Sequence, residues 1–232
     1  MTRYEAYITL YYALLNEAGK EDGLNENLNR FLERMNPFSS YSESSSDEDI
    51  YIRFCERWDR VGSTVTSNSQ NGGYTFCKVF IDTLPKRVKA FDDVKKSFLF
   101  IDQNDWNEAL KLQAYSGTYE LLFCLLSKHA DKSNEKLVEY LAEMDPFSDK
   151  FQNEGSNVWN RFYAFVSDFG FDGPDFVTAS KFVNSEKLDF LFDTFNEIKE
   201  SEWDDLRFNY PYSFRMKEKI RLLDIIKVGY LI

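Results

Sequence analysis

Two stretches of this chain decide its fold: NENLNRFLERMNPFS at residues 25–39 and NEKLVEYLAEMDPFS at residues 134–148. They lie 109 residues apart and are identical at eight of fifteen positions, where ordinary composition would give about one identity by chance. In both, apolar residues recur at spacings of three and four until a residue that precedes a proline, as in an amphipathic helix that ends there. The pattern predicts the same helix twice, and therefore an internal duplication.

Segments on either side of these stretches match in the same order. The pairs include Leu10 with Leu121, Arg53–Phe54 with Arg161–Phe162, and Trp106 with Trp203. From them we predict a first unit at residues 1–112 and a second at 113–232, with 110–126 as the linker. The first unit has 11 more residues before its tryptophan, and GSTVTSNSQNGG at 62–73 is expected to be the exposed loop that holds this insertion.

Apolar periodicity predicts an all-α fold with four to five helices in each unit. We expect the two units to pack as a compact pseudo-symmetric pair. A short helix is expected around each tryptophan, and an extra basic C-terminal helix at 214–228. A minor strand at 74–81 remains an alternative. The predicted helices are 4–15, 25–35, 50–58, 74–84 and 87–100 in the first unit, and 134–144, 157–165, 175–183 and 186–198 in the second.

The charge of the chain is acidic and uneven. The net charge is -11, and residues 113–206 hold 19 acidic and 8 basic side chains, whereas 207–232 holds six basic and two acidic ones. Nucleic-acid binding is disfavoured, because affinity for phosphate backbones comes from clustered lysine and arginine. An acidic surface speeds association with basic proteins, so we expect a protein partner, and a basic one.

The sequence also predicts the compartment and the absence of cofactors. No window approaches eighteen consecutive apolar residues, and the N-terminal stretch lacks the uninterrupted apolar core of a signal peptide. We therefore expect a cytoplasmic protein that does not enter a membrane. The three cysteines have no C-x-x-C spacing, which predicts reduced thiols and no metal site. No glycine-rich phosphate-binding motif is present, so no cofactor is predicted.

Five residues are candidates for partner binding or for a structural role. Arg53 and Arg161 interrupt apolar helical stretches at matching positions, and either contact a partner or bond to the loop after the preceding helix. Tyr4 and Tyr11 belong to a helix whose tyrosines spread around much of its circumference, and Trp159 precedes Arg161. Tyrosine and tryptophan rimmed by charge are typical of interfaces.

The residue inventory argues against most enzymes. His129 is the only histidine and is expected to be exposed, which removes most imidazole-based catalysis. Our hypothesis is a non-enzymatic, acidic, helical protein-binding module, such as a cytoplasmic bacterial immunity protein that neutralises a toxin. Two alternatives stay open: an oligomeric structural scaffold, and an enzyme with a carboxylate and arginine site between the two copies. The oligomeric state does not follow from the sequence.

Overall fold

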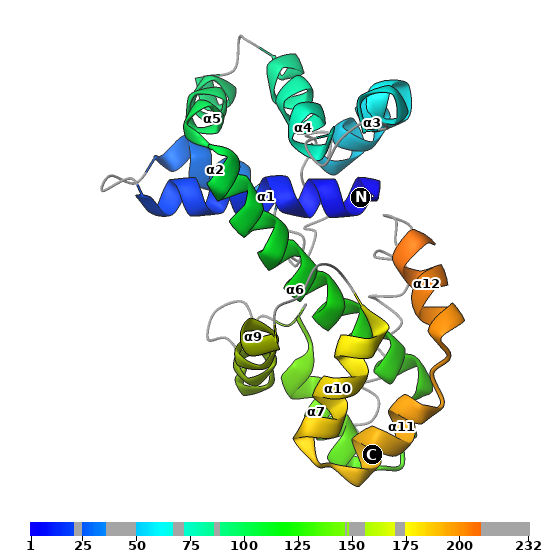
Figure 1. Cartoon of the computed structure of the whole chain (residues 1–232). Helices are drawn as coiled ribbons and strands as arrows, with labels where there is room; N and C mark the ends of the chain where they lie inside the picture. Colours follow the sequence, from blue (N-terminus) through cyan, green and yellow to red (C-terminus); the bar gives the residue numbers. More distant parts are fainter. Residues whose placement is uncertain are drawn as a thin grey trace. The chain divides into compact units, whose positions relative to one another are not determined.

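The computed structural model describes residues 1–20, 25–35, 50–66, 72–85, 89–146, 148, 156–169 and 175–209. Every regular element within these ranges is an α-helix (Figure 1), which confirms the all-α class. The alternative of a strand at 74–81 is wrong, because those residues belong to a helix. None of the helices in these ranges is long and apolar enough to cross a membrane.

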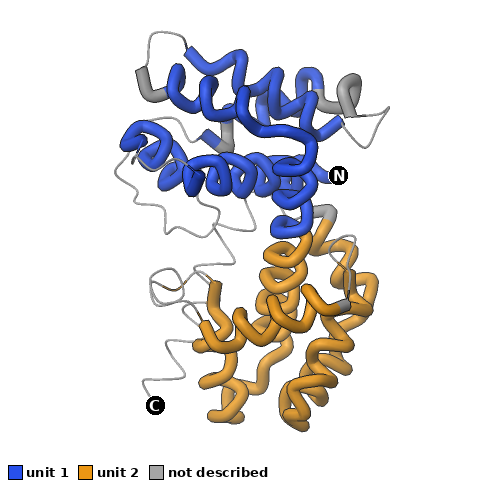
Figure 2. Tube along the Cα trace, turned by 60° about the vertical axis from the view of Figure 1, so that its left-hand side comes forward, with its two compact units in different colours: residues 1–113 blue, residues 114–232 orange. Residues whose placement is uncertain are grey.

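The chain divides into two compact units, residues 1–113 and 114–232 (Figure 2). The point of division falls inside α6 (Gln103–His129), a single helix of 27 residues. We predicted a short helix around Trp106 and then a linker at 110–126, and this was wrong. That segment contains no proline and only one glycine, Gly117, so nothing in it stops a helix.

Unit 1 is built around its first helix. It contains α1 (Arg3–Lys20), α2 (Glu26–Met35), α3 (Ile50–Thr66), α4 (Gly72–Thr83), α5 (Lys89–Phe100) and the start of α6. Helix α1 contacts each of the next four helices, while α2 packs against α5 and α3 against α4. Because α1 has neighbours on several sides, every residue from Tyr4 to Tyr11 is buried.

Unit 2 contains the rest of α6 and five described helices: α7 (Glu135–Met144), α9 (Asn157–Phe169), α10 (Phe176–Glu186), α11 (Asp189–Asn196) and α12 (Glu200–Asn209). Helix α7 contacts α9 and α11, and α10 contacts α9 and α11. The α6 residues 118–127 are all buried. The predicted C-terminal helix at 214–228 lies outside the described residues.

The described parts of the two matching stretches, residues 25–35 and 134–144, form equivalent local structures. Helices α2 and α7 each span ten residues and end at Met35 and Met144, as predicted. Asn25 Oδ1 accepts a hydrogen bond from the Leu28 amide at 3.1 Å, and Asn134 Oδ1 accepts one from the Leu137 amide at 3.2 Å. These asparagines satisfy amides that have no partner inside the helix.

A tyrosine from the preceding helix closes the end of each of these helices. The Tyr7 hydroxyl donates to the Met35 carbonyl at 3.1 Å, and the Tyr119 hydroxyl donates to the Met144 carbonyl at 2.9 Å. The last carbonyls of a helix lack partners within it. Each tyrosine therefore satisfies an orphan acceptor and fixes the helix end against its neighbour.

The aromatic cores of the units also repeat. Phe54 lies 5.2 Å from the Tyr7 ring and 5.0 Å from the Phe80 ring. The corresponding centroid distances of Phe162 are 5.3 Å to Tyr119 and 5.0 Å to Phe182. Such tilted and edge-to-face pairs add stability beyond the area they bury.

A second group of three rings recurs around the tryptophans. In unit 1, Tyr74 stacks on Phe98, with 5.5 Å between the ring centroids and 20° between the planes, and meets Trp106 edge-on at 5.4 Å. In unit 2, Phe176 stacks on Phe195 at 5.1 Å and 21°, and meets Trp203 edge-on at 5.8 Å.

The predicted insertion loop at 62–73 is too long. Helix α3 continues to Thr66 and α4 begins at Gly72, so only residues 67–71 fall outside the described helices. Gly73 is buried in the first turn of α4, and a Cβ on it would overlap the Met1 sulfur and lie 3.6 Å from Trp106 Cζ2. Glycine at this position permits close packing of the helix. In the sequence alone, the same glycine looks like part of a loop.

Candidate functional site

Arg161, on α9, is held by a carboxylate of the same unit. Its Nε donates to Glu186 Oε1 at 2.9 Å, and its Nη2 donates to Glu186 Oε2 at 2.6 Å. The Tyr140 hydroxyl donates to the same Oε2 at 2.9 Å. This forked pairing raises the pKa of the half-exposed Arg161. Glu186 is the last residue of α10, so the partner is not the loop we expected but a helix end.

Arg53 has different surroundings at the matching position. Glu186 follows Phe182 by four residues, as Leu84 follows Phe80, and the intervening hydroxyls of Ser185 and Thr83 donate to the Phe182 and Phe80 carbonyls at 2.6 Å. Leu84 therefore occupies the place of Glu186. Phe31, four residues before Met35, likewise occupies the place of Tyr140. Neither replacement side chain can accept or donate a hydrogen bond.

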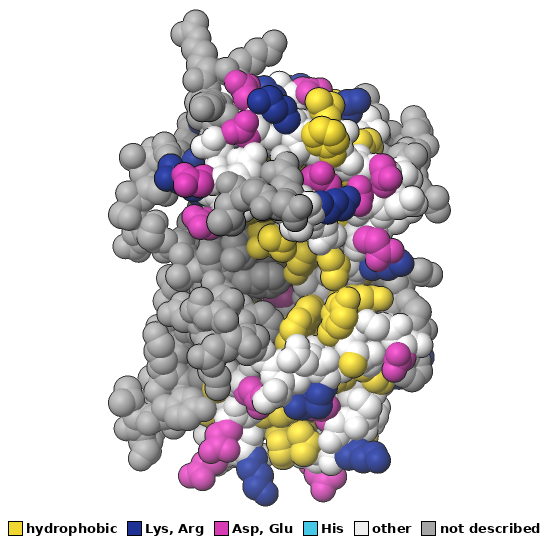
Figure 3. Space-filling model, turned by 90° about the vertical axis from the view of Figure 1, so that its left-hand side faces the viewer, with side chains coloured by type: hydrophobic (Ala, Val, Ile, Leu, Met, Phe, Trp, Pro, Cys, Tyr) yellow, Lys and Arg dark blue, Asp and Glu magenta, His cyan; other side chains and the backbone are white. Residues whose placement is uncertain are grey.

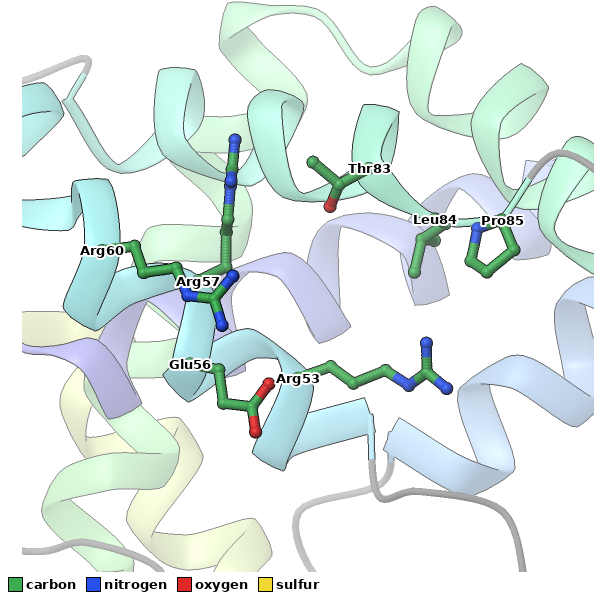
Figure 4. Close-up of a pocket in the computed structure, with 7 residues that line it drawn as sticks. All are labelled: Arg53, Glu56, Arg57, Arg60, Thr83, Leu84 and Pro85. Carbon is green, nitrogen blue, oxygen red and sulfur yellow. The ribbon is translucent and has the colours of Figure 1, made fainter.

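A cavity of about 260 Å³ lies where Arg53 faces the end of α4 (Figure 4). Three arginines of α3 line it together with one carboxylate, and we call it the arginine cavity. In Figure 4 the Arg53 side chain runs below Leu84 and Pro85. The described residues that line it are Arg53, Glu56, Arg57, Arg60, Thr83, Leu84 and Pro85.

Arg53 was among the residues predicted from the sequence, but Arg57 and Arg60 were not. The signal was present, because RFCERWDR at 53–60 places the three arginines at spacings of four and three, which is one face of a helix. The Arg57 Nε is buried and has no hydrogen-bond partner among the described residues. Lys95 brings a further cation close, since its Nζ donates to the Leu84 carbonyl at 2.7 Å.

The aromatic candidates contribute mainly to packing. Tyr4 and Tyr11 are each only 9% exposed, which leaves little of either ring for a partner and favours their structural alternative. Burial also raises the pKa of Tyr11. Trp159 is half-buried, and its ring meets Tyr119 at 5.0 Å and stacks on Phe162 at 6.0 Å.

A different aromatic residue reaches the surface of unit 2 beside acidic side chains. In α11, Leu191 and Phe195 point into the core, while Asp189, Phe192, Asp193 and Asn196 are exposed. These four share one side of the helix because they recur at spacings of three, one and three, and we call this side the α11 face. Phe192 is 42% exposed. Figure 3, which is viewed from the left-hand side of Figure 1 and not from the side of α11, shows hydrophobic side chains among charged ones on that surface too.

A carboxylate in the first turn of α12 pairs with the end of α6. The Glu202 carboxylate accepts a hydrogen bond from Lys128 Nζ at 2.9 Å and lies 3.0 Å from His129 Nε2. His129 is half-buried, whereas we expected it to be exposed. The Lys128 hydrogen bond and the Lys199 amide lower the pKa of Glu202 to about 2. In unit 1, Asp105 accepts from Lys20 in the same manner, and its pKa is also lowered.

The cysteines and potential metal ligands form no site in the described part of the chain. Cys77 and Cys124 are buried and Cys55 is half-buried, and burial raises the pKa of the Cys77 thiol. The described His, Cys, Asp and Glu side chains include no group of three or more that could hold a metal ion. No family model, curated protein or solved structure matches this chain.

Proposed function

We propose that this chain is a non-enzymatic module of two diverged helical copies that binds a basic protein partner through an acidic surface. The observation that carries the binding function is the α11 face, where Phe192 is exposed between Asp189 and Asp193. An aromatic ring supplies apolar contact area, and the flanking carboxylates attract and orient a cationic partner.

The duplication is supported by contacts that recur in both units. Both have a tyrosine bonded to the carbonyl of a methionine that ends a helix, a central phenylalanine with the same ring neighbours, and a three-ring group around a tryptophan. Even a polar detail repeats, because the Trp106 and Trp203 indole nitrogens are both buried without a described hydrogen-bond partner. Divergence from one ancestral unit explains this agreement most simply.

The acidic charge continues from α11 into α12. Glu197, Glu200, Asp204 and Asp205 are exposed in the sequence that follows the α11 face. Lys199 is the only basic residue among the exposed residues 197–205. The carboxylates therefore create a negative potential that accelerates encounters with basic proteins. A cytoplasmic immunity protein that neutralises a basic toxin or nuclease has this requirement, and it is the specific function that we propose.

The test is capture of a partner from the source cells, followed by reconstitution with that partner in purified form. We expect a basic protein to bind in a one-to-one ratio. Phe192→Ala should weaken binding at least about 30-fold, as for an interface hot spot. Adding Asp189→Lys and Asp193→Lys should abolish binding by placing like charges against the partner.

Helix α9 offers a matched control. Tyr163 is 41% exposed and Asp168 is exposed, so Tyr163→Ala with Asp168→Lys changes a comparable surface away from the α11 face. This control should leave the affinity unchanged. The proposal fails if no basic protein is retained in stoichiometric amounts, or if the α11 variants still bind it normally. A toxin gene directly beside this one would support the immunity function specifically.

A further inference from the structure

We infer that the arginine cavity of unit 1 binds a small anion that carries a phosphate group, a site separate from the α11 face. Arg53, Arg57 and Arg60 line it from one face of α3, and Glu56 is the only acidic side chain among the described lining residues. Arginine stays protonated in proteins, so the three arginines and Glu56 together carry a net charge of about +2. Its planar fork of N–H donors matches the oxygens of phosphate.

The Arg57 side chain supplies the second observation. Its Nε is buried, yet it has no hydrogen-bond acceptor among the described residues. A buried donor without an acceptor is unfavourable, and native structures rarely leave one in place unless a water, an ion or a ligand completes it. An anion in the adjoining cavity supplies that acceptor.

In unit 2, the position that matches Arg53 is Arg161, and a carboxylate lies beside it. There the Glu186 carboxylate binds the Arg161 guanidinium through two nitrogens. In unit 1 the place of that carboxylate is taken by Leu84, which lines the cavity. Leu84 carries no negative charge at the place where Glu186 supplies one in unit 2, so an anion meets no built-in carboxylate from α4 there.

The size and the walls of the cavity limit the ligand. About 260 Å³ is smaller than the roughly 300–1,000 Å³ typical of pockets for drug-sized molecules. Inorganic phosphate, pyrophosphate or the phosphoryl end of a small metabolite fits this volume better than a whole nucleotide. Leu84 and Pro85 give one apolar wall, which suits a short carbon portion attached to the phosphate.

The experiment is isothermal titration of the full-length protein with inorganic pyrophosphate at low salt, with inorganic phosphate and sulfate in parallel. We expect saturable one-site binding that weakens as salt is added. The affinity should decrease in the order pyrophosphate, phosphate, sulfate. Arg57→Gln and Arg60→Gln should each weaken pyrophosphate binding about tenfold. Glu56→Gln should strengthen it severalfold, because it removes the carboxylate that repels the anion.

Two further variants separate a site from general attraction to positive charge. Arg30→Gln removes an exposed arginine of the same unit, on α2, and should leave binding unchanged. Leu84→Glu places a carboxylate where unit 2 has one and should abolish binding. If Arg57→Gln unfolds the protein, which circular dichroism would reveal, the exposed Glu56→Gln still decides the question.

Three results would overturn the inference. One is the absence of saturable pyrophosphate binding at millimolar concentration. Another is an equal loss of affinity in Arg30→Gln, which would mean that the anion responds only to net charge. The third is unchanged affinity in Glu56→Gln, because a carboxylate that lines the site must affect an anion bound there.

Discussion

The α3–α4 pair of unit 1 and the α9–α10 pair of unit 2 share an apolar interior but differ at their charged rim. Both bury a phenylalanine against the next helix, at 5.0 Å between the rings. In unit 2 Glu186 engages the rim arginine, and Phe165 and Asp168 stand where unit 1 has Arg57 and Arg60. Differences among the side chains at the rim thus separate an ion pair from a cationic cavity, while the buried phenylalanine contacts stay alike.

The strongest challenge to this comparison is removal of the shared phenylalanine. Phe54 and Phe162 are both 0% exposed, so Phe54→Ala and Phe162→Ala should each lower the free energy of unfolding by about 3–5 kcal/mol. Urea denaturation followed by circular dichroism measures this. Leu99→Ala is the control, because Leu99 is 75% exposed and its loss should change stability by less than about 0.5 kcal/mol. A marked difference between the two phenylalanines would break the comparison.

A smaller loss of stability is expected when Glu186, the acceptor of the ion pair in unit 2, is replaced by the leucine that unit 1 has at the matching position. Glu186→Leu removes the acceptor of both Arg161 and Tyr140, and should cost about 1–3 kcal/mol of stability, as for hydrogen bonds to a charged group. Chemical denaturation provides the measurement. The variant should gain no affinity for pyrophosphate, because unit 2 lacks the other two arginines. An unchanged unfolding free energy would mean that the pair contributes nothing.

The tyrosines that close α2 and α7 should have equal and still smaller effects. Tyr7→Phe and Tyr119→Phe each remove one buried hydrogen bond to a methionine carbonyl. We expect each to destabilise the protein by about 1 kcal/mol, measured by urea unfolding. Tyr163→Phe, on an exposed ring, should have almost no effect. A loss confined to one of the first two variants would show that the matched contacts are not energetically equivalent.

The smallest effect concerns pH. Lys128 and the Lys199 amide lower the pKa of Glu202 from 4.5 to about 2. Because the folded-state pKa lies below the unfolded one, this stabilisation is fully present above pH 4.5 and is lost as the pH falls towards 2. A partly exposed pair contributes less than about 1 kcal/mol.

Thermal unfolding across this pH range tests the effect. Glu202→Gln should be less stable than the wild type above pH 4.5, and the two proteins should converge near pH 2. Glu200→Gln, at an exposed neighbouring position, should follow the wild type throughout. A constant difference between Glu202→Gln and the wild type at every pH would exclude a contribution from ionisation.

Local signals in the sequence predicted the helices well where they were complete. Asn134 and the proline after Asp145 flank the ten residues of α7, and the helix has the predicted end. Asp175 similarly caps α10, where its carboxylate accepts from the Val177 and Thr178 amides. These interactions join neighbours in sequence, so no knowledge of the tertiary fold was needed.

Interactions between distant residues could not be predicted in the same way. Glu186 follows Arg161 by 25 residues, and only the packing of α10 brings them together. The match of α1 with α6 also differs by one residue from the observed contacts: Leu10 was matched with Leu121, whereas the corresponding bonds of Tyr7 and Tyr119 make Leu122 its equivalent, and both are 0% exposed. A helix that is buried all round has no polar side to reveal its phase.

Helix α6 restricts how the two units can be separated experimentally. A protease or a truncation that divides residues 1–113 from 114–232 must cut a continuous helix and not a loop. The cut would leave up to four amides and four carbonyls without their partners, next to a stretch where Ala114, Tyr115 and Ser116 are buried. Fragments meant to fold alone should therefore both retain residues 103–129, and a fragment that ends at Gln113 should fray from its new terminus.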